Sequence, residues 1–484
     1  MKILKDLKEQ LHKKGVDIIN TDYYDIIDMW NSWYKGSVDD FHYYNVKIAD
    51  GSTAQFERKT MSMAKKGAED MMKLLWSNKC DIKLGSDEKT KKLWDVLDSK
   101  QNNFTIMFPQ MIELAMALGT TAMTQYKDAM GRTRIEYINN AKAIIPYAYD
   151  NFNITGFIVF NQWQEVEKKN KIYYTHLTYH EFKAEKDEKG EYKQVYRKYN
   201  EVYKSKNPDE LGKEVEFSEI FPDVEELVEE NTNTPHFQII KPPIANNVDI
   251  NTPMGLSIFG NSIDKLKAID NKYDSFDMEF VDGKRRILVD RTALKGTPQV
   301  DSEGNISQQL YFDRNDRTYV AMNGMKDQPV KDISFDLRYQ EHIDSINAEL
   351  NWYSASLGFG ESFYKFDGNG QATATEILSQ DDDAFRTKQT FEVVIKDVII
   401  DLVKSVCYLE GIELSENEIQ VEFDYSRFEN QEKVQMRLER EVSKGITSKV
   451  EYRMKVYNET QEIAEQKIKE IQENDPSVKD LIGE

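Results

Sequence analysis

The chain has little cysteine and no long apolar run. Only Cys80 and Cys407 occur in 484 residues, which favours free thiols in a reducing compartment over a disulfide framework. The most apolar segment, 391–406, is interrupted by five charged residues and falls short of the ~18 apolar residues of a membrane span. The first residues are charged every few positions, with no apolar stretch before a small-residue cleavage site, so we expect no signal peptide. These absences predict a soluble, intracellular protein that does not bind membranes.

The common catalytic signatures are also missing. The sequence contains no phosphate-binding loop, dinucleotide fingerprint, HExxH or GxSxG motif. The residues best suited to metal chemistry are His176, His180 and the run Asp381-Asp382-Asp383. Alternating neighbours favour a strand around the histidines, which sets them about 13 Å apart at ~3.3 Å per residue, too far for one ion. We predict no enzyme, cofactor or metal, and keep a cytosolic metal-dependent hydrolase using these residues as the alternative.

Positive charge is in deficit. Asp and Glu number 85 against 64 Lys and Arg, a formal charge of −21, which excludes indiscriminate adhesion to nucleic acid. A nucleic-acid role then needs a local basic patch or a path along which the polymer slides. The densest basic cluster away from the N-terminus is Lys284-Arg285-Arg286. These cations could contact phosphates or an acidic partner, or offset the dipole of a preceding helix.

The hydrophobic pattern predicts an α+β protein with more than one packed unit, since the length exceeds the ~250–300 residues of a single core. Residues 1–120 look mainly helical, with eight aromatics packed into 23–44. Residues 132–250 show short alternating runs separated by polar turns, which is typical of antiparallel strands. The strand at 419–426 is isolated in sequence and is expected to pair with this β-rich region.

Two long amphipathic helices are predicted on either side of a small β module. The first covers 255–282, and the second covers 336–357 with apolar residues every three or four positions. Between them, 283–335 reads as short strands with glycine-containing turns. The residues predicted to pack along the helices are Phe259, Ile263, Leu266, Tyr339, Ile343, Ile346, Leu350 and Tyr353.

The segments that follow predict a loop, a third long helix and a helical tail. Residues 358–373 contain four glycines, which permit backbone conformations that other residues resist, and several aromatics. No Gly or Pro interrupts 374–410, so one helix is expected there, ending at Gly411. Ser448 and Glu451 form a predicted capping box that opens a highly charged helical segment, 449–473.

The order of these parts resembles the portal proteins of tailed bacteriophages, in the branch that infects Gram-positive hosts. The resemblance covers nearly the whole chain and rests on order and spacing, since none of its segments is a catalytic fingerprint. The most specific segments are WNSWYKGSVDDFHYYN at 30–45, AKKGAEDMMKLLWSNK at 64–79, GLSIFGNSIDKLKAIDNKYDSF at 255–276, ASLGFGESFYKFDGNGQATATEI at 355–377 with FRTKQT at 385–390, and GITSKVEYRM at 445–454.

The resemblance implies a portal fold with named parts. Residues 1–254 would form the wing, 255–282 and 336–357 the stem helices, 283–335 the clip and 358–373 a tunnel loop facing DNA. Residues 374–429 would be a long helix with a strand returning to the wing, and 430–484 the crown. The loop residues that would face the channel are Phe359, Phe363, Tyr364, Lys365 and Phe366, and those of the clip that would face the terminase are Lys284, Arg285 and Arg286. The alternative for the loop is that its aromatics fold back onto the stem as a buried plug.

The resemblance also implies partners and a location. Such proteins form a homo-oligomeric ring of about a dozen copies at one capsid vertex, through which double-stranded DNA is packaged and ejected. The implied partners are the terminase large subunit, a head-tail adaptor or neck protein, and the major capsid and scaffolding proteins. The implied location is the virion, after assembly in the host cytoplasm. A third possibility is an oligomeric scaffold without a channel.

Overall fold

The computed structural model describes most of the chain, which consists of two units, Met1–Val421 and Glu422–Glu484. The described residues are 2–47, 51–167, 170–186, 190–283, 286–290, 297–300, 306–309, 319–322, 330–333, 336–366, 374–415, 417–424, 438–457, 459 and 461–473.

The first unit begins with the predicted helical block. Its helices are α1 (Lys2–Lys13), α2 (Tyr23–Lys35), α3 (Met63–Leu75), α4 (Asp87–Leu97) and α5 (Phe104–Leu118). A hairpin that the sequence reading did not predict, β1 (Tyr43–Lys47) with β2 (Thr53–Glu57), follows α2 after its left-handed C-cap Gly36. The aromatic cluster of α2 packs inward, with Tyr23, Tyr24, Trp30 and Trp33 all buried.

The β-rich part forms two sheets. The larger has the order β10-β9-β8-β7-β6, with β11 also pairing β9, and is built on three long antiparallel strands. Its members are β6 (Ile144–Asp150), β7 (Asn153–Glu167), β8 (Asn170–Lys186), β9 (Tyr192–Ser205), β10 (Lys213–Val215) and β11 (Leu227–Asn231), with the short helix α6 (Phe217–Ile220) between the last two. The smaller has the order β12-β4-β5, from β4 (Thr121–Lys127), β5 (Thr133–Ile138) and β12 (Phe237–Ile240).

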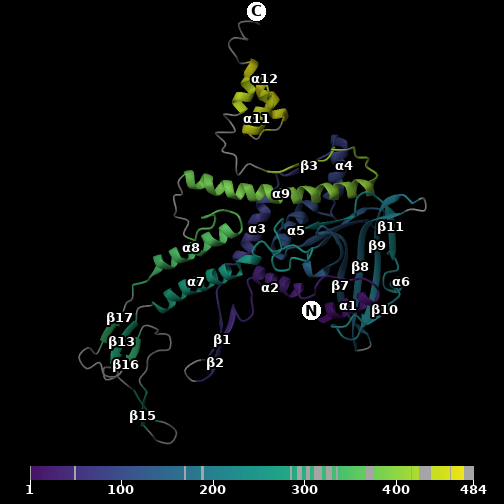
Figure 1. Cartoon of the computed structure of the whole chain (residues 1–484). Coiled ribbons are helices and arrows are strands. Elements are labelled where there is room, and N and C mark those ends of the chain that lie inside the picture. Colours follow the sequence, from purple (N-terminus) through teal and green to yellow (C-terminus); the bar gives the residue numbers. More distant parts are fainter. Residues whose placement is uncertain are drawn as a thin grey trace, which may run out of the picture. The chain divides into compact units, whose positions relative to one another are not determined.

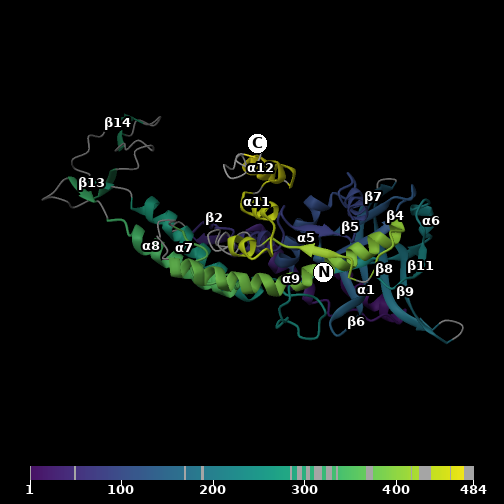
Figure 2. The ribbon, with the colours of Figure 1, turned by 90° about the horizontal axis from the view of Figure 1, so that it is seen from above.

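The two long amphipathic helices are α7 (Ile263–Asp282) and α8 (Tyr339–Ser356), which we call the stem pair. They lie side by side in both views (Figures 1 and 2). The first helix starts later than predicted: after a 3₁₀ turn at Gly260–Ser262, α7 begins at Ile263, so the expected start at 255 is wrong. Gly255 instead approaches the backbone of Gly119 so closely that an added Cβ would lie 2.1 Å from the Gly119 carbonyl oxygen.

The segment between the stem helices contains strands, as predicted. Strand β13 (Arg286–Asp290) pairs in parallel with β16 (Tyr319–Met322) and antiparallel with β17 (Val330–Ile333). A separate hairpin joins β14 (Thr297–Val300) and β15 (Ile306–Gln309).

Helix α9 (Ala374–Glu410) is the longest element and ends at Gly411, which is left-handed with φ +66°, as predicted. It packs against β12, β4 and α3, and α3 lies next to it in Figure 1. The strand that follows, β18 (Gln420–Glu422), pairs with β3 (Asp81–Lys83) of the helical block. The expected pairing with the β-rich region is therefore wrong.

The second unit contains α11 (Lys449–Tyr457) and α12 (Gln461–Glu473). The predicted capping box is present at the start of α11. The backbone N–H of Glu451 donates to Oγ of Ser448 at 3.1 Å, and the backbone N–H of Ser448 donates to Oε2 of Glu451 at 2.8 Å. Across the described parts of both units, no helix is long and apolar enough to cross a membrane.

Candidate functional site: the stem pair and its loop

The stem pair is buried at one end only. At the end where α7 begins and α8 finishes, Leu266 and Ile269 of α7 and Ile346, Leu350 and Tyr353 of α8 are all buried, and none of these side chains is more than 2% exposed. Phe259, predicted as part of the same stripe, is fully buried but precedes the helix, and Ile263 is half-buried. The predicted seam therefore packs closely at this end, which we call the near end.

The opposite end, where α7 finishes and α8 begins, is open, and we call it the far end. Tyr339 is 54% exposed and Phe280 is 44% exposed, whereas Ile343 is half-buried. Glu279 of α7 pairs with Arg338 at the start of α8, with an N···O distance of 2.7 Å. Hydrogen bonds from this guanidinium and from the Arg338 backbone lower the pKa of Glu279 to about 2. An ion pair with its hydrogen bonds joins the helices here, beside a ring contact between Phe276 and His342 at 6.0 Å between centroids.

A glycine in the middle of α3 allows α8 to approach at the near end. An added Cβ at Gly67 would lie 2.6 Å from Oη of Tyr353 and 2.8 Å from Cδ1 of Leu357. The Tyr353 hydroxyl donates to the Met63 carbonyl at 2.9 Å. Burial, and secondarily the nearby Asp70 carboxylate, raise the pKa of Tyr353, so this hydroxyl stays protonated.

The loop after α8 folds back onto the stem pair over its described part, 358–366. Phe359 is fully buried, Tyr364 is 7% exposed, and Phe363 and Phe366 are half-buried. Phe359 stacks on Phe363 at 4.6 Å between ring centroids, and Phe366 packs edge-on against Phe276 of α7 at 5.4 Å.

In the single subunit, Phe359 and Tyr364 are enclosed by their own chain and expose little or no surface. Their expected role in facing the channel stays a prediction. Lys365 is exposed, as a channel residue would require. The remaining residues of the predicted loop, 367–373, lie outside the described residues.

The basic cluster of the predicted clip is described only in part. Lys284 and Arg285 lie outside the described residues. Arg286 is the first residue of β13, and only its backbone is described. Its interpretation as a docking site stays a prediction.

The candidate metal ligands whose side chains the structure describes are not brought together; the side chain of Asp381 lies outside the described part. His176 and His180 lie on β8, as the strand pattern predicted, and pair across the sheet with Val202 and Lys198. Burial lowers the pKa of both imidazoles, so both are neutral at pH 7. Asp382 and Asp383 are exposed on α9. No group of three or more metal-ligating side chains occurs within the part of the chain that the structure describes.

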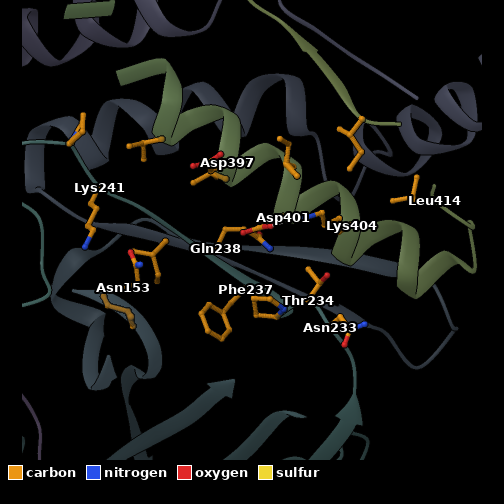
Figure 3. A pocket seen from close by; sticks show the side chains of 18 of the residues that line it. Asn153, Asn233, Thr234, Phe237, Gln238, Lys241, Asp397, Asp401, Lys404 and Leu414 are labelled. Atoms are coloured by element: carbon orange, nitrogen blue, oxygen red, sulfur yellow. Dashed lines mark ion pairs between the residues drawn. The ribbon is translucent and has the colours of Figure 1, made fainter. Parts of the chain in front are cut away.

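A hollow that the sequence reading missed runs along α9 (Figure 3). It has a volume of about 1240 Å³ and lies between α9 and β12, with Asp397, Asp401 and Lys404 on the helix side and Lys241 beyond the strand. Burial raises the pKa of Asp401 and lowers that of Lys241. The four-residue spacing of Asp397 and Asp401 indicates that they share one face of α9. The opposite wall of the hollow comes from β12, which is far from α9 in the sequence, so the sequence around the aspartates does not reveal the hollow.

Comparison with protein families finds a match over residues 16–478, to the model described as phage portal protein, SPP1 Gp6-like. The chain belongs to this portal protein family. The portal assignment agrees with the resemblance that the sequence segments indicated, and with the mixed helical and sheet architecture. Comparison with curated proteins found no match.

Three solved structures are similar in fold, each 9% identical and each covering 81% of this chain and 88% of the other. They are the virion of a native gene transfer agent particle, with a TM-score of 0.39, the neck of the empty particle computed with C6 symmetry, also 0.39, and the neck of the native particle computed with C12 symmetry, 0.33. The family assignment rests on the match over residues 16–478 and not on these likenesses.

Proposed function

We propose that this chain is the subunit of a portal ring, the channel for DNA packaging and ejection at one vertex of a phage capsid. The observation that carries the proposal is the family match over residues 16–478, which spans both structural units. A ring of identical subunits needs two different, complementary surfaces on each copy. The exposed apolar residues at the far end of the stem pair supply candidate contact surface for a neighbouring copy.

The charge of the chain supports a channel that does not retain DNA. At −21 per copy, about a dozen copies carry on the order of −250 charges. An acidic bore repels phosphates and so lets the duplex move. Lys365, exposed in the loop, would add one phosphate contact per subunit, which gives only a shallow dependence of DNA binding on salt.

The proposed partners follow the division of the chain. The β module at 283–335, with Lys284, Arg285 and Arg286, would meet the terminase large subunit. The ring would also contact a head-tail adaptor or neck protein and the major capsid and scaffolding proteins, and it would carry out no catalysis. The mature location would be the virion, after assembly in the host cytoplasm.

Electron microscopy of the purified chain tests the proposal. We expect closed rings with an axial hole wide enough for duplex DNA. A monodisperse monomer would contradict both the portal function and the oligomeric scaffold, and an oligomer without a hole would contradict the portal function and favour the scaffold. Replacing Lys284, Arg285 and Arg286 together by Gln should leave the rings intact and lower terminase binding, because the cluster would act through charge. Unchanged terminase binding would show that these three residues are not part of the surface that binds the terminase.

A further inference from the structure

A polar contact holds the first half of the loop inside an otherwise aromatic cluster. The hydroxyl of Tyr364 donates a hydrogen bond of 3.0 Å to Oδ2 of Asp70 on α3. The other oxygen, Oδ1, lies 2.6 Å from Nζ of Lys66, one turn earlier on the same helix. Asp70 is 9% exposed, so both oxygens of its carboxylate are engaged in a largely buried setting. Asp70, which lies 294 positions before Tyr364 in the sequence, therefore holds the loop in place.

The same stretch is tied to α8 and α9 by neutral hydrogen bonds. The backbone N–H of Tyr364 donates to Oγ of Ser354 at 3.2 Å, and that of Phe366 donates to Oδ1 of Asn347 at 2.8 Å. Oγ1 of Thr387 donates to the Gly358 carbonyl at 2.7 Å. A hydrogen bond to an ionised acceptor is roughly twice as strong as a neutral one. Of these four hydrogen bonds, the one to Asp70 is the one whose acceptor belongs to an ion pair, with Lys66.

Two glycines make the fold-back possible. Gly358 and Gly360 have φ angles of +80° and +82°, which residues with a Cβ rarely adopt. At Gly358 an added Cβ would also lie 2.6 Å from Oγ1 of Thr387. The chain turns at these glycines, and Tyr364 then reaches α3.

We propose that Asp70 is the positioning residue of the loop: its carboxylate anchors Tyr364, keeping 358–366 folded against the stem pair and withdrawn from the channel. The withdrawal from a channel rests on the proposed portal function, whereas the anchor itself rests on the contacts above. Because Asp70 belongs to α3, the anchor links the loop to the N-terminal helical block. Loss of the anchor releases Tyr364 and its neighbours toward the bore.

Limited trypsin digestion tests the anchor directly. Lys365 is the only Lys or Arg between 358 and 373, and both of its neighbours, Tyr364 and Phe366, are packed. Cleavage after Lys365 therefore requires the loop to open. Tyr364→Phe removes only the hydroxyl and should speed this cleavage on the order of tenfold to a hundredfold, the range expected for losing a hydrogen bond to a charged group. Asp70→Ala should do the same, whereas Asp70→Asn keeps an acceptor oxygen and should fall between it and the wild type.

The matched control is Tyr137→Phe, whose hydroxyl donates to the Asn102 carbonyl at 2.8 Å, away from the loop. It should leave cleavage after Lys365 at the wild-type rate. Wild-type cleavage of Tyr364→Phe at Lys365 would overturn the anchor, and so would equal acceleration at every tryptic site, which indicates global unfolding.

A second measurement separates the anchor from the portal function. Rings of Tyr364→Phe should package DNA more slowly than those of Tyr137→Phe, because the released aromatics narrow the bore. Equal packaging rates would overturn the withdrawal from the channel. Failure of the wild type to form rings would overturn the portal function, while the digestion result would still decide the anchor.

Discussion

The two ends of the stem pair share one sequence pattern and differ in what covers them. At the near end, where α7 and α8 contact each other, Leu350 and Ile346 are almost completely buried. At the far end, Tyr339 continues the same spacing yet is 54% exposed. A helical repeat thus identifies the side that faces a partner helix, but the degree of burial depends on whatever else packs there. Stability should therefore be concentrated at the near end, and the far end is available for other contacts.

The largest effect is expected from Leu350→Ala. Truncating this side chain, which is 1% exposed, should lower the free energy of unfolding by about 2–5 kcal/mol, because it removes buried apolar area and leaves a cavity. Denaturant unfolding of the purified chain measures the change. Ile343→Ala, half-buried toward the far end, is the matched control and should cost less. Equal losses at both positions would contradict the difference between the ends.

Gly67→Ala tests the near end from the side of α3. Alanine favours a helix over glycine by about 1 kcal/mol, so an open site would gain stability. Here the added Cβ would meet Tyr353 and Leu357, and overpacking typically costs about 1–3 kcal/mol. We expect a net loss of stability in denaturant unfolding. A gain would show that α8 does not approach α3 as closely as the structure indicates.

Arg338→Gln tests the electrostatic contact of the far end. The pKa of Glu279, about 2 in the folded chain, should rise toward its ordinary value of 4.5 when the guanidinium is removed. Because the folded pKa is depressed, this contact stabilises the fold above about pH 4.5, and the stabilisation is lost as pH falls from there toward 2. NMR titration of the Glu279 carboxyl measures the pKa, and added salt should weaken the pairing. An unchanged pKa would mean that the pairing with Arg338 is absent in solution.

The smallest effect is expected from Tyr339→Ala. A side chain that is 54% exposed should change the free energy of unfolding of the isolated subunit by no more than about 0.5 kcal/mol. Ring assembly should be measured in parallel. If Tyr339 lies at a subunit contact, its truncation would weaken assembly and leave the stability of the subunit unchanged. A loss comparable with that of Leu350→Ala would show that the far end is as tightly packed as the near end.

The sequence predicted the features that depend on neighbouring residues. The seam of α8, the end of α9 at Gly411 and the capping box of Ser448 and Glu451 are all present, because periodicity, a left-handed glycine and reciprocal side-chain bonds act over a few positions. The α+β class followed from the same local patterns.

The features that failed depend on distant segments. The start of α7 is delayed where Gly255 meets Gly119, and the partner of β18 was misassigned because strand pairing carries no local signal. The sequence left open whether the loop aromatics face the channel or fold back onto the stem, since nothing near Tyr364 in sequence reveals that Asp70 supplies its hydrogen-bond partner. The channel-facing role of these residues stays a prediction.

The pairing of β18 with β3 has a consequence for the order in which the chain folds. Strand β3 is synthesised about 340 residues before its partner, which at about 5–20 residues per second is a delay of roughly 17–70 s. During that time the backbone of Asp81–Lys83 has no β18 to pair with, and for most of it the near end also lacks Leu350 and Tyr353, which precede β18 by about 70 residues. Part of the apolar surface of the N-terminal helical block therefore stays exposed while the rest of the chain is synthesised. A host chaperone that binds such surface should raise the yield of folded subunits.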